Sequence, residues 1–191
     1  MPLPREFGAA PQDPSDGNNS NKNEEKDLPK GVVLGPDGKP CRTCTSGAAW
    51  KAMLKKTSGA SAAAQTSKAA APADSSSECP ADVEQLGRSS WTLLHTMAAT
   101  YPERPNAEQQ RDAVSFVSSL SRLYPCHWCA SDFQRWMKEA KNAPRVSSRE
   151  EFSQWLCEAH NEVNRKLGKP EFDCAKVDER WRTGWKDGRC D

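Results

Sequence analysis

The stretch SREEFSQWLCEAHNEVNRKLGKP, residues 148–170, decides the fold. Ser148 and Glu151 stand three residues apart, which is the spacing of a capping box at a helix start. Apolar residues then recur every three or four positions, as on one face of a helix; they are Phe152, Trp155, Leu156, Ala159 and Val163. Gly168 and Pro170 end the pattern. The stretch therefore predicts an amphipathic helix with one side facing a core.

The same period appears in three further segments, which are 83–101, 113–124 and 126–137. Asn106 and Gln109 form a plausible capping pair before the second of them, and Pro125 separates the second from the third. A shorter fifth helix fits 175–184. No segment alternates with period 2, as a half-buried strand would. The prediction is an all-α domain, a four-helix bundle plus a short fifth helix.

The chain divides near residue 79. Residues 1–78 hold only two of the 14 aromatic residues. The stretch 45–78 is largely Ala, Ser, Lys and Thr, which bury too little apolar area to offset chain entropy. We therefore predict a mostly disordered tail and linker over 1–78 and a helical domain over 79–191. Three apolar residues in the linker, Trp50, Met53 and Leu54, have the spacing of one helical turn. They either form a turn that docks on another part of the protein or are clustered by chance.

The composition excludes several classes of protein. The formal net charge is +1, which provides no electrostatic footprint for nucleic acid or an acidic membrane surface. No apolar run approaches the roughly 20 residues of a membrane-spanning helix. Residues 1–16 match neither a secretory signal nor a basic amphipathic presequence, so composition does not indicate the compartment.

Eight cysteines in 191 residues point to redox or metal chemistry. Cys41 and Cys44 form one C-x-x-C motif, and Cys126 and Cys129 form another. Zinc modules usually separate such pairs by about 12–20 residues, and here 81 residues intervene, so a shared zinc site is the alternative to a redox role. The redox interpretation explains why Cys126 opens a helix, because the helix dipole and free N–H groups lower a cysteine pKa there. His127 either lowers it further or is an ordinary exposed histidine.

Four cysteines lie outside the two motifs. A bridge between Cys157 and Cys174 would hold the fifth helix against the fourth and stabilise the fold by about 3 kcal/mol; two buried free thiols are the alternative. Cys79 and Cys190 stand at opposite edges of the domain and could pair within the chain or across a dimer. Spacing alone does not choose among these pairings.

Two helices carry a polar or aromatic stripe beside the apolar one. On one helix the stripe is Cys157, His160, Asn161 and Asn164, and on another it is Arg88, Trp91 and His95. The stripes either line a cavity or are ordinary surface and core residues. The sequence has no G-x-G-x-x-G motif, which is the signature of a dinucleotide-binding Rossmann fold. The residues alone therefore indicate a helical dithiol protein with a candidate pocket.

Residues 79–191 resemble the FAD-linked sulfhydryl oxidases of the mitochondrial intermembrane space, the family of augmenter of liver regeneration. The matching motifs, in order, are Cys79-Pro80, LGRSSW (86–91), LHT (94–96), YPCHWC (124–129), HNEVNRKLGKP (160–170) and DERW (178–181). The resemblance implies a helical bundle that encloses FAD without a Rossmann fold. It assigns FAD contacts to Arg88, Trp91, His95, Tyr124, Cys129, His160, Asn161, Val163, Asn164, Lys166, Lys169, Arg180 and Trp181.

The resemblance also assigns roles to the cysteines. Cys126 and Cys129 correspond to the redox pair, with Cys129 beside the isoalloxazine ring and Cys126 attacked by the incoming thiolate. Many members have two acidic residues between these cysteines, where this chain has His127 and Trp128. The resemblance implies that Cys157 and Cys174 form a structural bridge within the chain. It implies that Cys79 and Cys190 of opposite subunits pair, which gives two bonds between the subunits of a homodimer.

Long members of the family carry a shuttle pair in the tail, which Cys41 and Cys44 resemble. Electrons would then pass from a thiol-bearing import oxidoreductase through the shuttle, the redox pair and FAD to cytochrome c or O₂, in the intermembrane space. Two other classes compete with this interpretation, namely a zinc-stabilised interaction module and a purely structural disulfide-linked dimer. Neither accounts for the two polar stripes.

Overall fold

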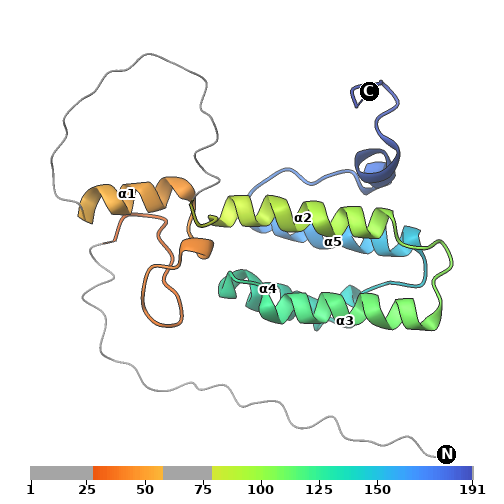
Figure 1. The fold of residues 1–191 in the computed structure, drawn as a ribbon, viewed down its shortest axis with the longest axis horizontal. Coiled ribbons are helices and arrows are strands. Elements are labelled where there is room, and N and C mark those ends of the chain that lie inside the picture. Colours follow the sequence, from red (N-terminus) through yellow and green to blue (C-terminus); the bar gives the residue numbers. More distant parts are fainter. Residues whose placement is uncertain (1–27, 58–78, 191) are drawn as a thin grey trace, which may run out of the picture.

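The computed structural model describes residues 28–57 and 79–190, and this part of the chain is helical (Figure 1). The four long helices of the domain are α2 (Val83–Ala99), α3 (Ala107–Leu123), α4 (His127–Met137) and α5 (Arg149–Lys166). They occur where the apolar period predicts them, so the predicted four-helix bundle is confirmed. The described residues contain no β-strand, only an isolated bridge between Leu34 and Pro40.

Local capping fixes where these helices begin. The Asn106 side chain accepts from the Gln109 N–H at 2.8 Å and the Gln109 side chain accepts from the Asn106 N–H at 2.9 Å, so the predicted capping box before α3 is present. At α5, Ser148 accepts from the Glu151 N–H at 3.1 Å. The Glu151 carboxylate hydrogen-bonds the neighbouring Ser147 hydroxyl. Only one half of the second predicted capping box is therefore seen.

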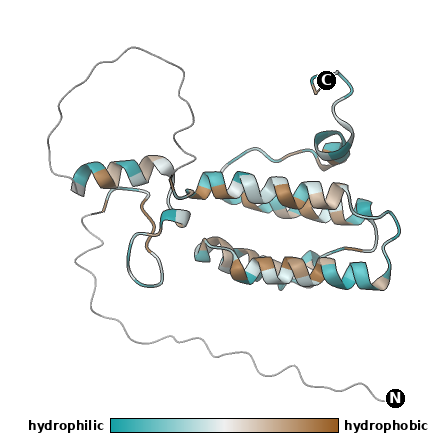
Figure 2. Ribbon diagram, viewed as in Figure 1, coloured by the Kyte–Doolittle hydropathy of each residue, from teal (hydrophilic) through white to brown (hydrophobic). Residues whose placement is uncertain are grey.

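The helices form two pairs, α2 with α5 and α3 with α4 (Figure 1). Figure 2 shows hydrophobic and hydrophilic residues mixed along each helix, as expected for amphipathic helices. The core lies where the apolar faces of α2, α3 and α5 meet, and its buried residues are Leu94, Ala98, Ala113, Val117, Val146, Phe152, Trp155 and Leu156. Phe133, Trp136 and Met137 of α4 pack against it from one side. The centre is Trp155, which is fully buried and donates its indole N–H to the Asn142 carbonyl at 2.9 Å.

The C-terminal segment is helical over 174–183, so the short helix predicted over 175–184 is present, but its geometry is irregular. It begins as one 3₁₀ turn, η5 (Cys174–Lys176), continues through Val177 and Asp178 in α-helical conformation, and ends as one π-helical turn, η6 (Glu179–Thr183). The Cys174 sulfur is held in a disulfide, and Gly184 ends η6 with a φ of +79°, a conformation that favours glycine. Periodicity placed Val177 and Trp181 inward; Val177 is buried, and Trp181 is half-buried and stacks on His95.

The structure also differs from the linker expectation over part of the N-terminal region. Residues 47–57 form α1 (Gly47–Thr57), preceded by the 3₁₀ turn η2 (Arg42–Cys44). The helix is longer than the single turn that Trp50, Met53 and Leu54 predict, because its Ala49 and Met53 side chains are buried by packing that composition does not reveal. The rest of the predicted tail and linker, 1–27 and 58–78, lies outside the described residues. Within the described part, no helix has the length and apolarity needed to cross a membrane.

Candidate active site

The Cys126–Cys129 pair sits on the first turn of α4. Cys126 caps the helix, and its sulfur accepts from the Cys129 N–H at 3.3 Å. The two cysteines are joined by a disulfide with a Cα–Cα distance of 5.3 Å. Cys126 is 1% exposed, whereas Cys129 is exposed. The disulfide therefore joins a buried residue to an exposed one.

The Cys41–Cys44 pair lies directly beside that turn. It is also a disulfide, with a Cα–Cα distance of 5.2 Å, and Cys44 is buried. The Thr43 hydroxyl donates to the carbonyl of Pro125, the residue before Cys126, at 3.3 Å. The two C-x-x-C motifs, 81 residues apart in sequence, thus meet in the fold.

Both residues between the α4 cysteines contact the N-terminal segment. His127 Nδ1 lies 3.7 Å from the Cys44 sulfur. The Trp128 indole N–H donates to the Leu34 carbonyl at 3.2 Å, although the Trp128 side chain is 60% exposed. His127 therefore faces the other cysteine pair and is not an ordinary exposed histidine.

A second cluster joins the two predicted stripes. Trp91 and His160 stack almost parallel with ring centroids 4.1 Å apart, and His95 and Trp181 stack at 4.6 Å. The two stacks are linked by a 3.0 Å hydrogen bond between His95 Nε2 and His160 Nδ1. The Arg180 guanidinium lies 4.2 Å from the Trp181 ring centroid. Helices α2 and α5 and the η6 turn each contribute to this aromatic cluster.

Both histidines in the cluster are held neutral. Burial, with the nearby charges of His160 and Arg180, lowers the pKa of His95 to about 3. Burial and the charge of Lys169 lower the pKa of His160 to about 4. His95 Nδ1 is buried and has no hydrogen-bond partner, which is unusual for a polar atom in a protein interior.

These features fit an FAD site. A buried nitrogen without a partner is satisfied when a polar cofactor atom reaches it, and flat aromatic faces suit planar rings. The cations Lys169 and Arg180, whose charges act on the two histidines, suit an anionic pyrophosphate. Five of the residues assigned to FAD by the resemblance are gathered here, and these are Trp91, His95, His160, Arg180 and Trp181.

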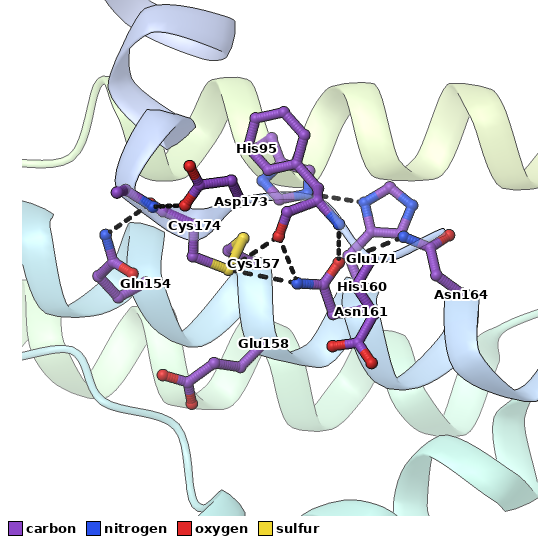
Figure 3. The surroundings of a disulfide bond; sticks show 12 residues. His95, Gln154, Cys157, Glu158, His160, Asn161, Asn164, Glu171, Asp173 and Cys174 are labelled. Carbon is purple, nitrogen blue, oxygen red and sulfur yellow. Dashed lines mark hydrogen bonds between the residues drawn. A yellow bond between two sulfur atoms is a disulfide. The ribbon is translucent and has the colours of Figure 1, made fainter. Parts of the chain in front are cut away.

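Asn161 has a different environment. Its amide N–H donates to the Phe172 carbonyl and its amide oxygen accepts from the Phe172 N–H, both at 2.8 Å. The same amide N–H lies 3.4 Å from the Cys174 sulfur, so Asn161 points into the loop that the Cys157–Cys174 disulfide closes (Figure 3). Asn164 donates to the Asn161 oxygen at 3.4 Å. The structure thus shows Asn161 holding the 168–174 loop.

The other residues assigned to FAD are spread around these clusters. Lys166 bridges α5 to α4 through Asp132 at 2.7 Å and contacts Glu162 at 3.1 Å. Arg88 is exposed on α2, and Tyr124 caps the C-terminal end of α3. Val163 and Tyr124 are half-buried, and Lys169 is exposed.

Sequence reasoning did not find three residues that shape the site. Thr43 hydrogen-bonds across to Pro125, and Thr45 is fully buried, with its hydroxyl accepting from the Val33 N–H at 3.0 Å. Asp132 pairs with Lys166 between helices. The position of Thr43 inside the C-x-x-C motif was a signal that could have drawn attention to it. No local sequence pattern distinguishes Thr45 or Asp132.

The remaining cysteines are arranged as follows. Cys157 and Cys174 form a disulfide with a Cα–Cα distance of 5.8 Å. Cys79 and Cys190 are free and exposed in the single chain. Among the described residues, the only group of three or more metal-ligating side chains contains one C-x-x-C pair, so the structure does not form the four-cysteine zinc site.

Comparison with known proteins gives consistent matches. The profile of the Erv1/Alr family matches residues 88–182. The chain is 43% identical over 169 residues to the mitochondrial FAD-linked sulfhydryl oxidase ERV1 of Saccharomyces cerevisiae, covering 81% of this chain and 88% of that protein. It is 37% identical to the protein of the same description from Schizosaccharomyces pombe, covering 78% of this chain and 90% of the relative.

A solved structure shares the fold. The crystal structure of the FAD binding domain of Erv1 from Saccharomyces cerevisiae superposes with a TM-score of 0.53 at 53% sequence identity. The superposition covers 56% of this chain and 100% of that one.

Proposed function

Because this chain belongs to the Erv1/Alr family, we propose that it oxidises the thiols of a protein substrate through two cysteine pairs acting in series. The general activity follows from the family and its relatives, since the chain is an FAD-linked sulfhydryl oxidase that generates disulfides. Bound FAD supplies the electron acceptor that protein side chains lack. The proposal concerns the route by which electrons reach it.

In this route the Cys41–Cys44 disulfide is the entry point. A substrate thiolate attacks one of its sulfurs, forms a mixed disulfide, and is released as part of a new substrate disulfide when its second thiol attacks. The shuttle pair, now a dithiol, attacks Cys126 and expels Cys129 as a thiolate. The second shuttle thiol then closes the shuttle disulfide and leaves Cys126 and Cys129 both reduced. One pair of electrons has then moved from the substrate to the α4 pair.

The observation that carries this proposal is the docking of one pair against the other. Thr43 is hydrogen-bonded to the residue preceding Cys126, and Cys44 lies beside His127. Cys126 is almost inaccessible to solvent, so a thiol carried by the adjacent segment has an advantage over one on a bulky protein. Tethering and docking together raise the effective concentration of the shuttle at the α4 pair.

The helix start favours Cys129 as the leaving thiolate. Free N–H groups and the dipole at the N-terminus of α4 stabilise negative charge in its first turn. Cys129 is the exposed residue of the pair, and we propose that its sulfur faces FAD. The aromatic cluster would hold the cofactor, together with the more peripheral residues Arg88, Tyr124, Asn161, Val163, Asn164, Lys166 and Lys169.

The remaining parts of the proposal concern partners and place. The relatives support a mitochondrial location, and we propose the intermembrane space, with an import oxidoreductase as the thiol substrate and cytochrome c or O₂ as the acceptor. Cys79 and Cys190 are both exposed, which leaves them available to link two subunits as a homodimer. We also propose 79–191 as the FAD-binding domain and the segment around Cys41 and Cys44 as its shuttle.

The test compares two substrates with two variants. Cys129→Ser should abolish oxidation of both dithiothreitol and a reduced protein substrate, measured as oxygen consumption. Cys41→Ser should spare dithiothreitol oxidation and cripple oxidation of the protein substrate. Equal loss on both substrates in Cys41→Ser, or full turnover in Cys129→Ser, would show that the route is wrong.

A matched control separates lost chemistry from lost folding. Ser131 is exposed on α4, close to the redox pair, and Ser131→Ala should leave both activities near the parent level. The flavin absorption spectrum of every variant is recorded before the assay, so that a variant without bound FAD is recognised.

A further inference from the structure

His127 and the shuttle pair bring together three atoms that can bind a metal ion. The proposed electron route gives these three atoms no joint role. The sulfurs of Cys41 and Cys44 and the Nδ1 atom of His127 all lie within 4.8 Å of one another. The distance from Cys44 Sγ to His127 Nδ1 is 3.7 Å. Two thiolates and an imidazole are the ligand types that Zn²⁺ prefers.

The spacing suits a tetrahedral ion. Zn–S bonds of about 2.3 Å and Zn–N bonds of about 2.0–2.1 Å at a tetrahedral angle place S and N about 3.6 Å apart. The observed 3.7 Å between Cys44 and His127 matches this value. Cysteines with two residues between them are a common zinc-ligand spacing, so Cys41 supplies a third ligand once the disulfide has opened.

We propose that the reduced shuttle pair binds Zn²⁺ together with His127, leaving the fourth coordination position to water. No electrons move in this step. The two thiols lose their protons on binding, and His127 coordinates through its neutral Nδ1. The reductant that opens the Cys41–Cys44 disulfide is the enzyme's own thiol substrate.

The docked segment is held in a position that allows this. Thr43 is bonded to Pro125 and Trp128 to Leu34, so contacts on both sides of the shuttle hold it against the start of α4. Cys44 is 8% exposed and Cys41 is half-buried, and two thiolate charges so close together and largely covered from water would be strongly disfavoured. A Zn²⁺ ion neutralises both, so the buried position favours the metal complex over the free dithiolate.

Zinc binding would compete with electron transfer. An ion that holds both shuttle sulfurs prevents either from attacking Cys126. This consequence rests on the proposed shuttle function, whereas binding of the ion does not. The oxidised pair has no thiolate to offer, so capture is confined to the reduced state.

The binding test uses Co²⁺ as a coloured probe for the zinc site. The full-length, FAD-loaded protein is reduced under anaerobic conditions, freed of reductant and titrated with Co²⁺. Tetrahedral thiolate coordination gives absorption at wavelengths longer than those of the flavin. We expect one Co²⁺ per chain, displaced by Zn²⁺, and no band in the oxidised protein.

Two variants decide the ligand set. His127→Asn should weaken binding by more than about 100-fold, because loss of even an outer-shell partner costs 10–100-fold. A Cys126→Ser/Cys129→Ser variant should keep the band. No band in the reduced parent protein, an unchanged affinity in His127→Asn, or loss of the band in the double variant would each overturn the site.

An activity assay separates the site from the shuttle. Zn²⁺ should inhibit oxidation of a reduced protein substrate by the parent enzyme and inhibit the His127→Asn enzyme much less. If Co²⁺ binds through His127 but Zn²⁺ does not slow the parent enzyme, the metal site stands and the shuttle route fails. If neither effect occurs, the metal site fails and the shuttle route is judged by the cysteine variants alone.

Discussion

Lowering the pH from 8 to 5.5 should destabilise the fold through the hydrogen-bonded pair of His95, which is buried, and His160, which is half-buried. His95 and His160 have folded-state pKa values of about 3 and about 4, below the ordinary value of about 6.5 that they regain on unfolding. The unfolded chain therefore binds protons in this window while the folded pair does not. A depressed pKa gives stability that is complete above the unfolded pKa and declines as the pH falls through it.

The magnitude follows from the unfolded state. Each of the two histidines stays neutral in the fold and titrates freely in the unfolded chain. At pH 5.5 each therefore lowers the free energy of unfolding by about 1.4 kcal/mol. The pair therefore costs about 3 kcal/mol relative to pH 8. Both folded-state pKa values lie below the window, so their separate sizes hardly affect this sum. The window also stays above the range where most carboxylates titrate.

Guanidinium unfolding followed by tryptophan fluorescence at a fixed excess of FAD, between pH 8 and pH 5.5, measures the effect. The variant His127→Asn is the matched control, because it removes the third histidine of the chain and leaves the pair intact. The free energy of unfolding of this variant should still fall by about 3 kcal/mol between pH 8 and pH 5.5. A free energy of unfolding that is flat or rises on acidification in this variant would refute the assignment of a neutral His95–His160 pair.

Three further predictions concern stability. Replacing Cys157 and Cys174 by serine should lower the free energy of unfolding by about 3 kcal/mol in urea titrations, as expected for a loop of this length; an unchanged midpoint would count against the bridge. Trp155→Ala should cost about 3–5 kcal/mol, because the fully buried indole leaves a cavity, and a loss below 1 kcal/mol would contradict its central place. Asn161→Ala should cost about 1–3 kcal/mol by leaving the Phe172 N–H and carbonyl without their partner. Hydrogen exchange at the Phe172 amide should accelerate, and unchanged protection would show that the loop is held by other contacts.

The helices of the domain could be predicted because their signals are local. The box before α3 joins residues three apart, and the core face of α5 repeats every three or four residues. The stripes were also visible in sequence, since Trp91 and His95 stand four apart on one helix. That they meet His160 and Trp181 in a stack is tertiary information, which periodicity does not contain.

The N-terminal segment could not be predicted in the same way. Thr43 finds its hydrogen-bond acceptor 82 residues away, and His127 reaches a sulfur 83 residues away. The sequence around α1 is rich in small residues, so its local composition indicates a linker, and packing of Met53 overrides that preference. The mixture of 3₁₀, α and π turns over 174–183 is likewise not visible in the sequence, and this segment begins at the Cys157–Cys174 bond, which joins residues 17 apart.

The loop held by Cys157–Cys174 and Asn161 leads directly into η6, the turn that carries Trp181 onto His95. One side of the aromatic cluster is therefore attached to the rest of the domain through a covalent bond that exists only after oxidation. A newly made chain with these two thiols still reduced would present an incomplete cluster and hold flavin weakly. On the proposed FAD site we therefore expect an order of maturation: this disulfide closes first and flavin is retained second, so an enzyme that makes disulfides for others would depend on one being made in itself.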